Sequence, residues 1–223
     1  MKEGPYNIKQ GEKLGRGMDK EVYIDPENLE RVFKFFTNEP AKEKFRSHVK
    51  ARFYFHKILH LIFPKMVPDI YFSSSEPNML KMQRINLDER HVAIQRASEY
   101  YFNNQKPPED VVAKEKRASR DIITDPGWKD FRDAMEALDI ESDLNAINFS
   151  SDEQGNLVYL DDFDPWIISE YGDHIENSFN MDKLKAKIET LDREKRENAS
   201  SFLYRLEELR KEANDEFKHG EVK

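Results

Sequence analysis

The stretch that most constrains the fold is 141–166, which reads ESDLNAINFSSDEQGNLVYLDDFDPW. Two short apolar segments in it flank the polar run 152–156, and Gly155 lies inside that run. Asp, Asn and Gly in such a run favour a tight turn between two strands. We therefore expect a hairpin that has Asp143 and Asn148 before it and an acidic group directly after it.

The acidic group consists of Asp161, Asp162 and Asp164. Transfer of a phosphoryl group to a hydroxyl needs a carboxylate that accepts the hydroxyl proton, and it needs oxygen ligands for a divalent cation. Asp143 is placed for the first role. Asn148 and the acidic group are placed for the second, so the pattern indicates a phosphotransferase site.

The segment 143–148, DLNAIN, resembles the D-L-x-x-x-N catalytic loop of the protein-kinase-like superfamily, which includes the aminoglycoside and choline phosphotransferases. The later Asp-Asp-Phe-Asp run resembles the magnesium-binding D-F-G segment of that superfamily. Two registers compete there. The usual spacing from Asn148 indicates Asp161, whereas the residue that precedes the phenylalanine is Asp162. The D-F pair and the following Asp164 slightly favour Asp162.

Two further features of the superfamily come earlier in the chain. Residues 14–23, LGRGMDKEVY, are similar to the glycine-rich loop, in which Gly15 and Gly17 would let backbone amides approach the phosphates of ATP. Lys34 is the interior lysine of the apolar segment 31–36 and resembles the strand lysine that holds the α- and β-phosphates. Taken alone, each feature is commonly structural. The order of the motifs along the chain favours the functional interpretation.

The hydrophobic pattern indicates strands in the first 85 residues, interrupted by a helical period over 37–62, and mostly helices afterwards. The resemblance implies an α+β, two-lobed protein-kinase-like fold. Residues 1–86 would form an N-terminal lobe with a five-stranded sheet and one long helix. Residues 87–223 would form a small, mainly helical C-terminal lobe that carries the catalytic-loop hairpin.

Three positions depart from the superfamily pattern. The glutamate that pairs with the strand lysine has no clear counterpart in the middle of the helix, and the nearest acids are Glu39 and Glu43 near its start. The histidine two residues before the catalytic aspartate is Glu141, and Lys20 or a neighbour replaces the third glycine. These departures motivate an alternative, a catalytically impaired pseudokinase that acts as a nucleotide-binding or scaffolding module through its helical tail.

The tail contains neither glycine nor proline over 174–218, and 167–180 is expected to be only a short link to it. Its apolar residues recur at helical spacing in two stripes that are out of phase. The pattern indicates either a helical hairpin or one helix that changes partners. Packing on the chain's own core is favoured over a homodimer through these helices. The stripes are Met181, Leu184, Ile188 and Leu191, and then Phe202, Leu206, Leu209 and Ala213.

Composition limits the remaining possibilities. The chain has 223 residues, a formal net charge of -8 and no cysteine. The acidic balance argues against nucleic-acid and membrane partners, and the lack of cysteine excludes disulfides, thiolate metal sites and a cysteine nucleophile. No apolar run approaches a membrane-spanning length and the N-terminal segment lacks an apolar signal core, so a cytoplasmic protein is expected.

The resemblance also implies ATP and magnesium as cofactors and a role for each candidate residue. An A-P-E segment after the acidic group is missing, and together with the D-F-D variant this favours a small-molecule hydroxyl acceptor over a protein. The implied catalytic residues are Asp143 and Asn148, the ATP-binding residues are Gly15, Gly17 and Lys34, and the magnesium ligands are Asn148, Asp162, Asp161 and Asp164.

Overall fold

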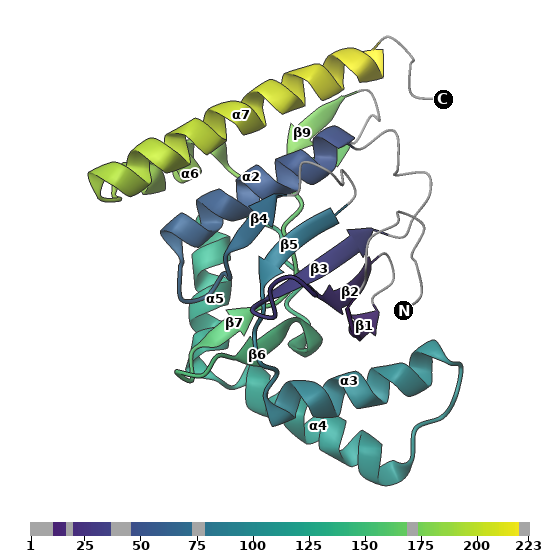
Figure 1. Cartoon of the computed structure of the whole chain (residues 1–223). Helices are drawn as coiled ribbons and strands as arrows, with labels where there is room; N and C mark the ends of the chain where they lie inside the picture. The colour runs from purple at the N-terminus through teal and green to yellow at the C-terminus, as the bar shows by residue number, and fades with distance from the viewer. Residues whose placement is uncertain (1–10, 17–19, 37–45, 73–78, 169–173, 219–223) are drawn as a thin grey trace. The chain divides into compact units, whose positions relative to one another are not determined.

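The computed structural model describes residues 11–16, 20–36, 46–72, 79–168 and 174–218 (Figure 1). Over these residues the fold is α+β, as predicted, with a five-stranded antiparallel sheet, two two-stranded sheets and six α-helices. The chain divides into two compact units. The first unit contains residues 1–62, 69–84 and 162–223, and the second contains residues 63–68 and 85–161.

The five-stranded sheet belongs to the first unit. Its strand order is β1-β2-β3-β5-β4, and every neighbouring pair is antiparallel. This sheet contains the strands that the alternating pattern predicted. The strands are β1 Lys13–Arg16, β2 Lys20–Ile24, β3 Arg31–Phe36, β4 Ile70–Phe72 and β5 Met79–Gln83.

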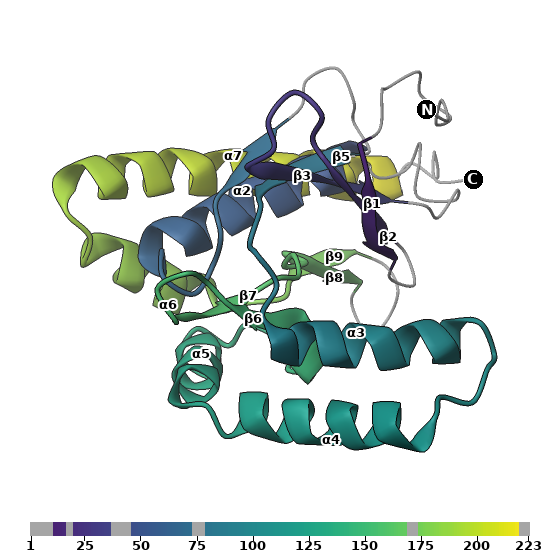
Figure 2. The same ribbon diagram turned by 60° about the horizontal axis from the view of Figure 1, so that its bottom comes forward.

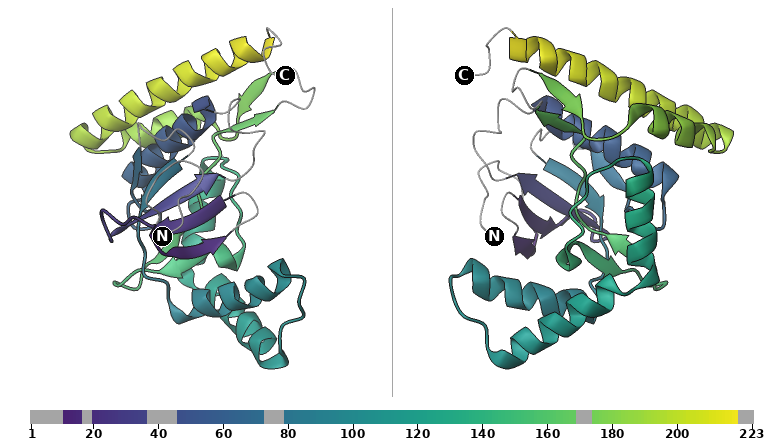
Figure 3. Two further views of the ribbon diagram at one scale, coloured as in Figure 1. Left: turned by 45° about the vertical axis from the view of Figure 1, so that its right-hand side comes forward. Right: turned by 180° about the vertical axis from the view of Figure 1, so that it is seen from behind.

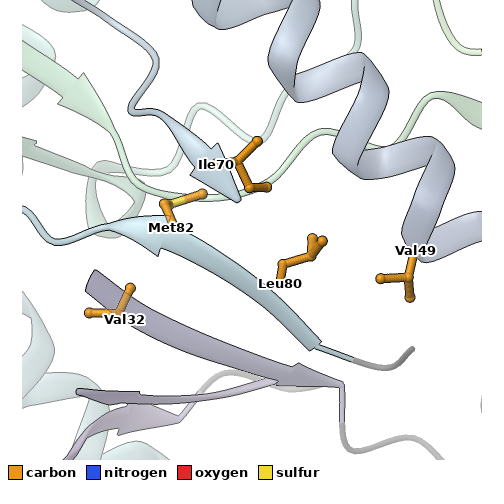
Figure 4. Close-up of a cluster of buried hydrophobic side chains, with 5 residues drawn as sticks. All are labelled: Val32, Val49, Ile70, Leu80 and Met82. Carbon is orange, nitrogen blue, oxygen red and sulfur yellow. The ribbon is translucent and has the colours of Figure 1, made fainter. Parts of the chain in front are cut away.

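Helix α2, Arg46–Ile62, packs on one face of this sheet. Figure 4 shows Val49 of the helix near apolar side chains from three strands, and these residues form one buried cluster: Val32, Val49, Ile70, Leu80 and Met82. Successive residues of a strand point to opposite faces. Lys34 therefore shares the face of Val32, whereas Phe33 and Phe35 form a second cluster with Met79 on the other face.

The C-terminal tail forms a helical hairpin of α6, Met181–Glu189, and α7, Arg193–Lys218. The hairpin alternative is therefore the correct one. Helix α7 runs along α2 in every view (Figures 1 and 3), and the ring of Phe202 lies 6.4 Å from that of Phe53 and 6.0 Å from that of Tyr54. Its apolar stripe thus packs on the chain's own first unit.

Residues 167–180 are more than the link that we expected. They contribute to a two-stranded antiparallel sheet of β8, Trp166–Ile168, and β9, Ile175–Asn177. Three-residue strands are too short to show a period of two in the sequence. The side chain of Asn214, on α7, accepts a hydrogen bond from the backbone N–H of Ile175 and donates one to its carbonyl, which attaches this hairpin to the tail.

The second unit is mainly helical. Figure 2 shows α3, Glu89–Phe102, beside α4, Glu109–Ile123, and α5, Pro126–Ala137, follows them. The expected hairpin is present: the strands β6, Phe149–Ser151, and β7, Leu157–Tyr159, follow the 3-10 turn Ala146–Asn148. The rings of Phe131, Phe149 and Tyr159 lie 4.7 to 5.3 Å apart and form the core under the hairpin.

The two units differ from the predicted lobes in two respects, and the smaller is that residues 63–68 group with the second unit. The chain leaves the sheet after Arg84, close to the predicted boundary at 86, but residues 162–223 group with the sheet and not with the second lobe. Aromatic packing explains this grouping. The ring of Phe55 on α2 stacks on Phe179 at 4.5 Å and meets Phe163 edge-on at 6.3 Å.

The packing of α7 on α2 leads to a stability prediction. Leu206 is 1% exposed, so Leu206→Ala removes buried apolar surface and leaves a cavity. We expect the free energy of unfolding of the full chain to fall by about 2–5 kcal/mol in a urea titration. Tyr204, on the same helix, is 57% exposed, so Tyr204→Ala should change it by less than about 0.5 kcal/mol. Equal effects of the two variants would contradict the packing of α7.

Candidate functional site

The first unit brings together Lys34 and Asp162, two of the residues predicted from separate motifs. The Nζ atom of Lys34 lies 3.8 Å from Oδ1 of Asp162, and the two side chains are only 7% and 1% exposed. Lys34 reaches this position because it lies on the face of the sheet that α2 covers. Asp162 is positioned by its neighbour Phe163, whose buried ring packs against Phe55 and His56 of α2.

Two further cations bind the same carboxylate. Lys20 donates from Nζ to Oδ1 of Asp162 at 2.5 Å, and Arg52 donates from Nη1 to Oδ2 at 2.7 Å. Burial alone would raise the pKa of Asp162. The nearby charges of Lys20, Lys34 and Arg52 outweigh burial and hold its pKa well below the ordinary value. Asp162 is therefore a buried carboxylate that stays ionised because cations surround it.

Arg52 also binds the second carboxylate of the acidic group. Its Nη2 donates to Oδ2 of Asp164 at 2.7 Å, while Nε2 of His48 lies 2.6 Å from Oδ1. The backbone N–H of Trp166 donates to the same Oδ1 at 3.2 Å. His48 and Arg52 are four residues apart on α2, so they share one face of the helix. Burial raises the pKa of Asp164, but His48 and Arg52 lower it further than burial raises it.

We use the name cationic cluster for Lys20, Lys34 and Arg52 around Asp162. Ammonium and guanidinium groups are donors that fit phosphate and carboxylate oxygens. Within the described parts of the chain, no group of three or more His, Asp or Glu side chains is arranged to hold a metal ion. The predicted magnesium ligands Asp162 and Asp164 instead share the guanidinium of Arg52.

The predicted catalytic loop lies in the second unit. Asp143 accepts a hydrogen bond at Oδ1 from the backbone N–H of Asn145, and Asn148 donates from Nδ2 to the backbone carbonyl of Asp143 at 3.1 Å. The carbonyl of Asn148 in turn accepts from the N–H of Leu160 at 2.7 Å, directly before Asp161. These hydrogen bonds within the loop fix its conformation, while the carboxylate of Asp143 is exposed.

Sequence reasoning missed His91 as the support of this loop. His91 is buried, and its Nδ1 lies 3.0 Å from the carbonyl oxygen of Phe149, the residue after Asn148. A carbonyl only accepts, so Nδ1 carries the proton of this bond. Burial is the main reason that the pKa of His91 is lowered, which keeps the ring neutral at neutral pH. No local signal links His91 to a loop that begins about 50 residues later.

The other predicted positions have mixed outcomes. Gly15 lies in β1 opposite Val22, whereas Gly17 falls outside the described residues, so the phosphate-covering role of these glycines stays a prediction. Glu39 and Glu43 also fall outside them. In the middle of α2, where the superfamily has its glutamate, the cation Arg52 faces the acidic group.

Comparison of the sequence with models of known protein families and with curated proteins finds no match. The assignment of function therefore depends on the motifs and on the geometry of the two units.

The lowered pKa of Asp162 leads to a pH-dependent prediction. Asp162→Asn leaves buried cations without their carboxylate, so we expect a loss of about 3–5 kcal/mol of stability at pH 7. In the wild type, the unfolded chain binds the Asp162 proton near pH 3.9, whereas the folded chain binds it only at lower pH. The stabilisation is thus present at neutral pH and is lost as the pH falls. The difference between wild type and variant should shrink below about pH 5.

Urea titrations of both proteins at pH 7, 5 and 3 measure this difference. Asp215→Asn is the matched control, since it makes the same chemical change at an exposed position of α7 in the same unit. It should shift the free energy of unfolding by less than about 0.5 kcal/mol at each pH. A difference between wild type and Asp162→Asn that does not depend on pH would refute the low pKa.

Proposed function

We propose that the protein is an ATP-dependent phosphotransferase that moves the γ-phosphate to a hydroxyl of a small-molecule acceptor. The observation that supports this most is the pairing of Lys34 with Asp162, because two motifs far apart in the sequence separately indicated Lys34 as a phosphate-binding residue and Asp162 as a metal ligand. A chance resemblance in either motif gives no reason for the two side chains to meet in one buried place.

The proposal assigns distinct tasks to residues of the two units. Lys34 would orient the α- and β-phosphates, with Gly15 and Gly17 covering them. Asp143 would accept or steer the proton of the attacking hydroxyl, a role that agrees with its exposed carboxylate and with the hydrogen bonds that fix its loop. Asn145 supports that loop by capping the following 3-10 turn.

Magnesium, when bound, would neutralise charge on the transferred phosphoryl group. Its proposed ligands, as the resemblance implies, are Asn148 and Asp162, with Asp161 as the alternative register, and Asp164. The carboxylate oxygens are the ligand type that magnesium prefers. Arg52 at present occupies one oxygen of Asp162 and one of Asp164, so its guanidinium would have to move before these oxygens bind a metal.

The acceptor is proposed from what the sequence lacks. No A-P-E segment follows Trp166, which is the first residue of β8, and β9 and the tail helices come soon after it. This leaves little chain for a long segment that would bind a protein substrate. A small hydroxyl compound, such as a sugar, an aminocyclitol or an amino alcohol, is the proposed acceptor class.

A second candidate function is favoured by one observation. Arg52 lies in the part of α2 where the superfamily has a glutamate, and it binds the carboxylates of both Asp162 and Asp164. This contact opposes binding of the metal ion that catalysis would need there. A nucleotide-binding module that does not transfer phosphate, a pseudokinase, fits that contact. The two candidates share nucleotide binding and differ in turnover.

Turnover separates these candidates. Purified protein with γ-labelled ATP and magnesium is incubated with a panel of sugars, aminocyclitols, amino alcohols and protein substrates, and labelled product is measured. We expect a labelled small molecule. Asp143→Asn should lower its formation by ~10²–10⁴-fold, because this change removes the proton acceptor.

Asp130→Asn is the control, since Asp130 is an exposed carboxylate on α5 of the same unit and carries no proposed role. It should retain wild-type activity. Labelling of proteins alone would contradict the acceptor class. No transfer to any acceptor, with nucleotide still bound, would favour the pseudokinase.

A further inference from the structure

We infer that the cationic cluster binds the phosphate groups of a nucleotide directly, through Lys20, Lys34 and Arg52, and that this binding needs no divalent cation. The inference rests on the proposed function and deepens it, because it separates nucleotide binding from the metal that turnover requires. It concerns the first unit alone, which contributes all three cations.

The first argument is that the cluster already holds an anion. Both oxygens of the Asp162 carboxylate accept from cationic donors, at 2.5 Å from Lys20 and 2.7 Å from Arg52. Both contacts are short, as hydrogen bonds between oppositely charged groups are. A terminal phosphate group presents oxygens of the same kind, with more negative charge. Asp162 is thus an internal anion that positions the three cations as a phosphate would.

The second argument is burial. The side chains of Lys20, Lys34 and Arg52 are 13%, 7% and 17% exposed. Partly desolvated cations attract an anion more strongly than exposed ones, since water screens them less. Their side chains are also ordered before binding, so little conformational entropy is lost when a phosphate binds. Arg52 adds a planar pair of donors, which suits phosphate oxygens better than an ammonium does.

The third argument is the local charge. The described side chains that pair at the site include three permanent cations, Lys20, Lys34 and Arg52, and two carboxylates, Asp162 and Asp164, so the permanent cations outnumber the carboxylates by one. Such a site favours a polyanion and opposes a free divalent cation. Magnesium also sheds its water reluctantly and needs open carboxylate oxygens, and Arg52 occupies one on each aspartate.

Calorimetric titration of the full-length wild type with ATP tests the inference directly, once in excess EDTA and once with magnesium. We expect the dissociation constant in EDTA to be within about threefold of the value with magnesium. Inorganic tripolyphosphate, used as a second probe in EDTA, should compete with ATP for the same site. Because this comparison uses unaltered protein, it does not depend on any variant being folded.

Two variants locate the binding. Arg52→Gln should weaken binding of ATP in EDTA by at least about tenfold, whereas Lys50→Gln, the same charge change at an exposed position of α2, should leave it unchanged. Asp162→Asn removes the internal anion and should keep or strengthen binding in EDTA. A site that depends on a metal bridge predicts the reverse for Asp162→Asn, with binding lost.

The outcomes separate the inference from the proposed function. Binding that occurs only with magnesium would overturn the inference and leave the phosphotransferase intact. Binding in EDTA that does not respond to Arg52→Gln would overturn the assignment to this cluster. No binding of ATP under either condition would overturn both the inference and the proposed function.

Discussion

The first unit depends on one buried carboxylate. The side chain of Asp162 is only 1% exposed. Burying an unpaired charge to this extent would destabilise the fold by more than a single favourable contact could offset. Lys20 from β2, Lys34 from β3 and Arg52 from α2 each approach it, so one ion-pair network joins the sheet, the helix and the segment that enters the C-terminal tail. The same network therefore fixes the fold locally and concentrates positive charge at the place where we propose that phosphate binds.

Features with a local signal could be predicted from the sequence. Alternation over 31–36 indicated β3 and placed Lys34 inside it, and the turn residues around Gly155 indicated the hairpin of β6 and β7. Gly155 has a φ of 81°, a backbone conformation that other residues rarely adopt, which is why it is informative. The out-of-phase stripes of the tail indicated either a helical hairpin or one helix that changes partners, and the break between α6 and α7 matches the first alternative.

Features that arise from contacts between distant segments could not be predicted in this way. The sequence marks Lys20 only as a replacement for a glycine and indicates no role for Arg52, yet both bind Asp162 more closely than Lys34 does. Charge on a strand or helix is usually solvated, so neither had a local reason to be buried. His91 and the three-residue strands β8 and β9 were missed for the same reason, since tertiary contacts determine their roles.

A crystal structure of the protein grown with ATP in the presence of EDTA tests the central claim most directly. The account predicts phosphate oxygens within hydrogen-bond distance of Lys34 Nζ and of the Arg52 guanidinium, with the Arg52–Asp162 contact weakened or exchanged for a contact to phosphate. ATP bound elsewhere, with Lys20, Lys34 and Arg52 still gathered on Asp162, would contradict it. In that case the cationic cluster would be a purely structural ion-pair network.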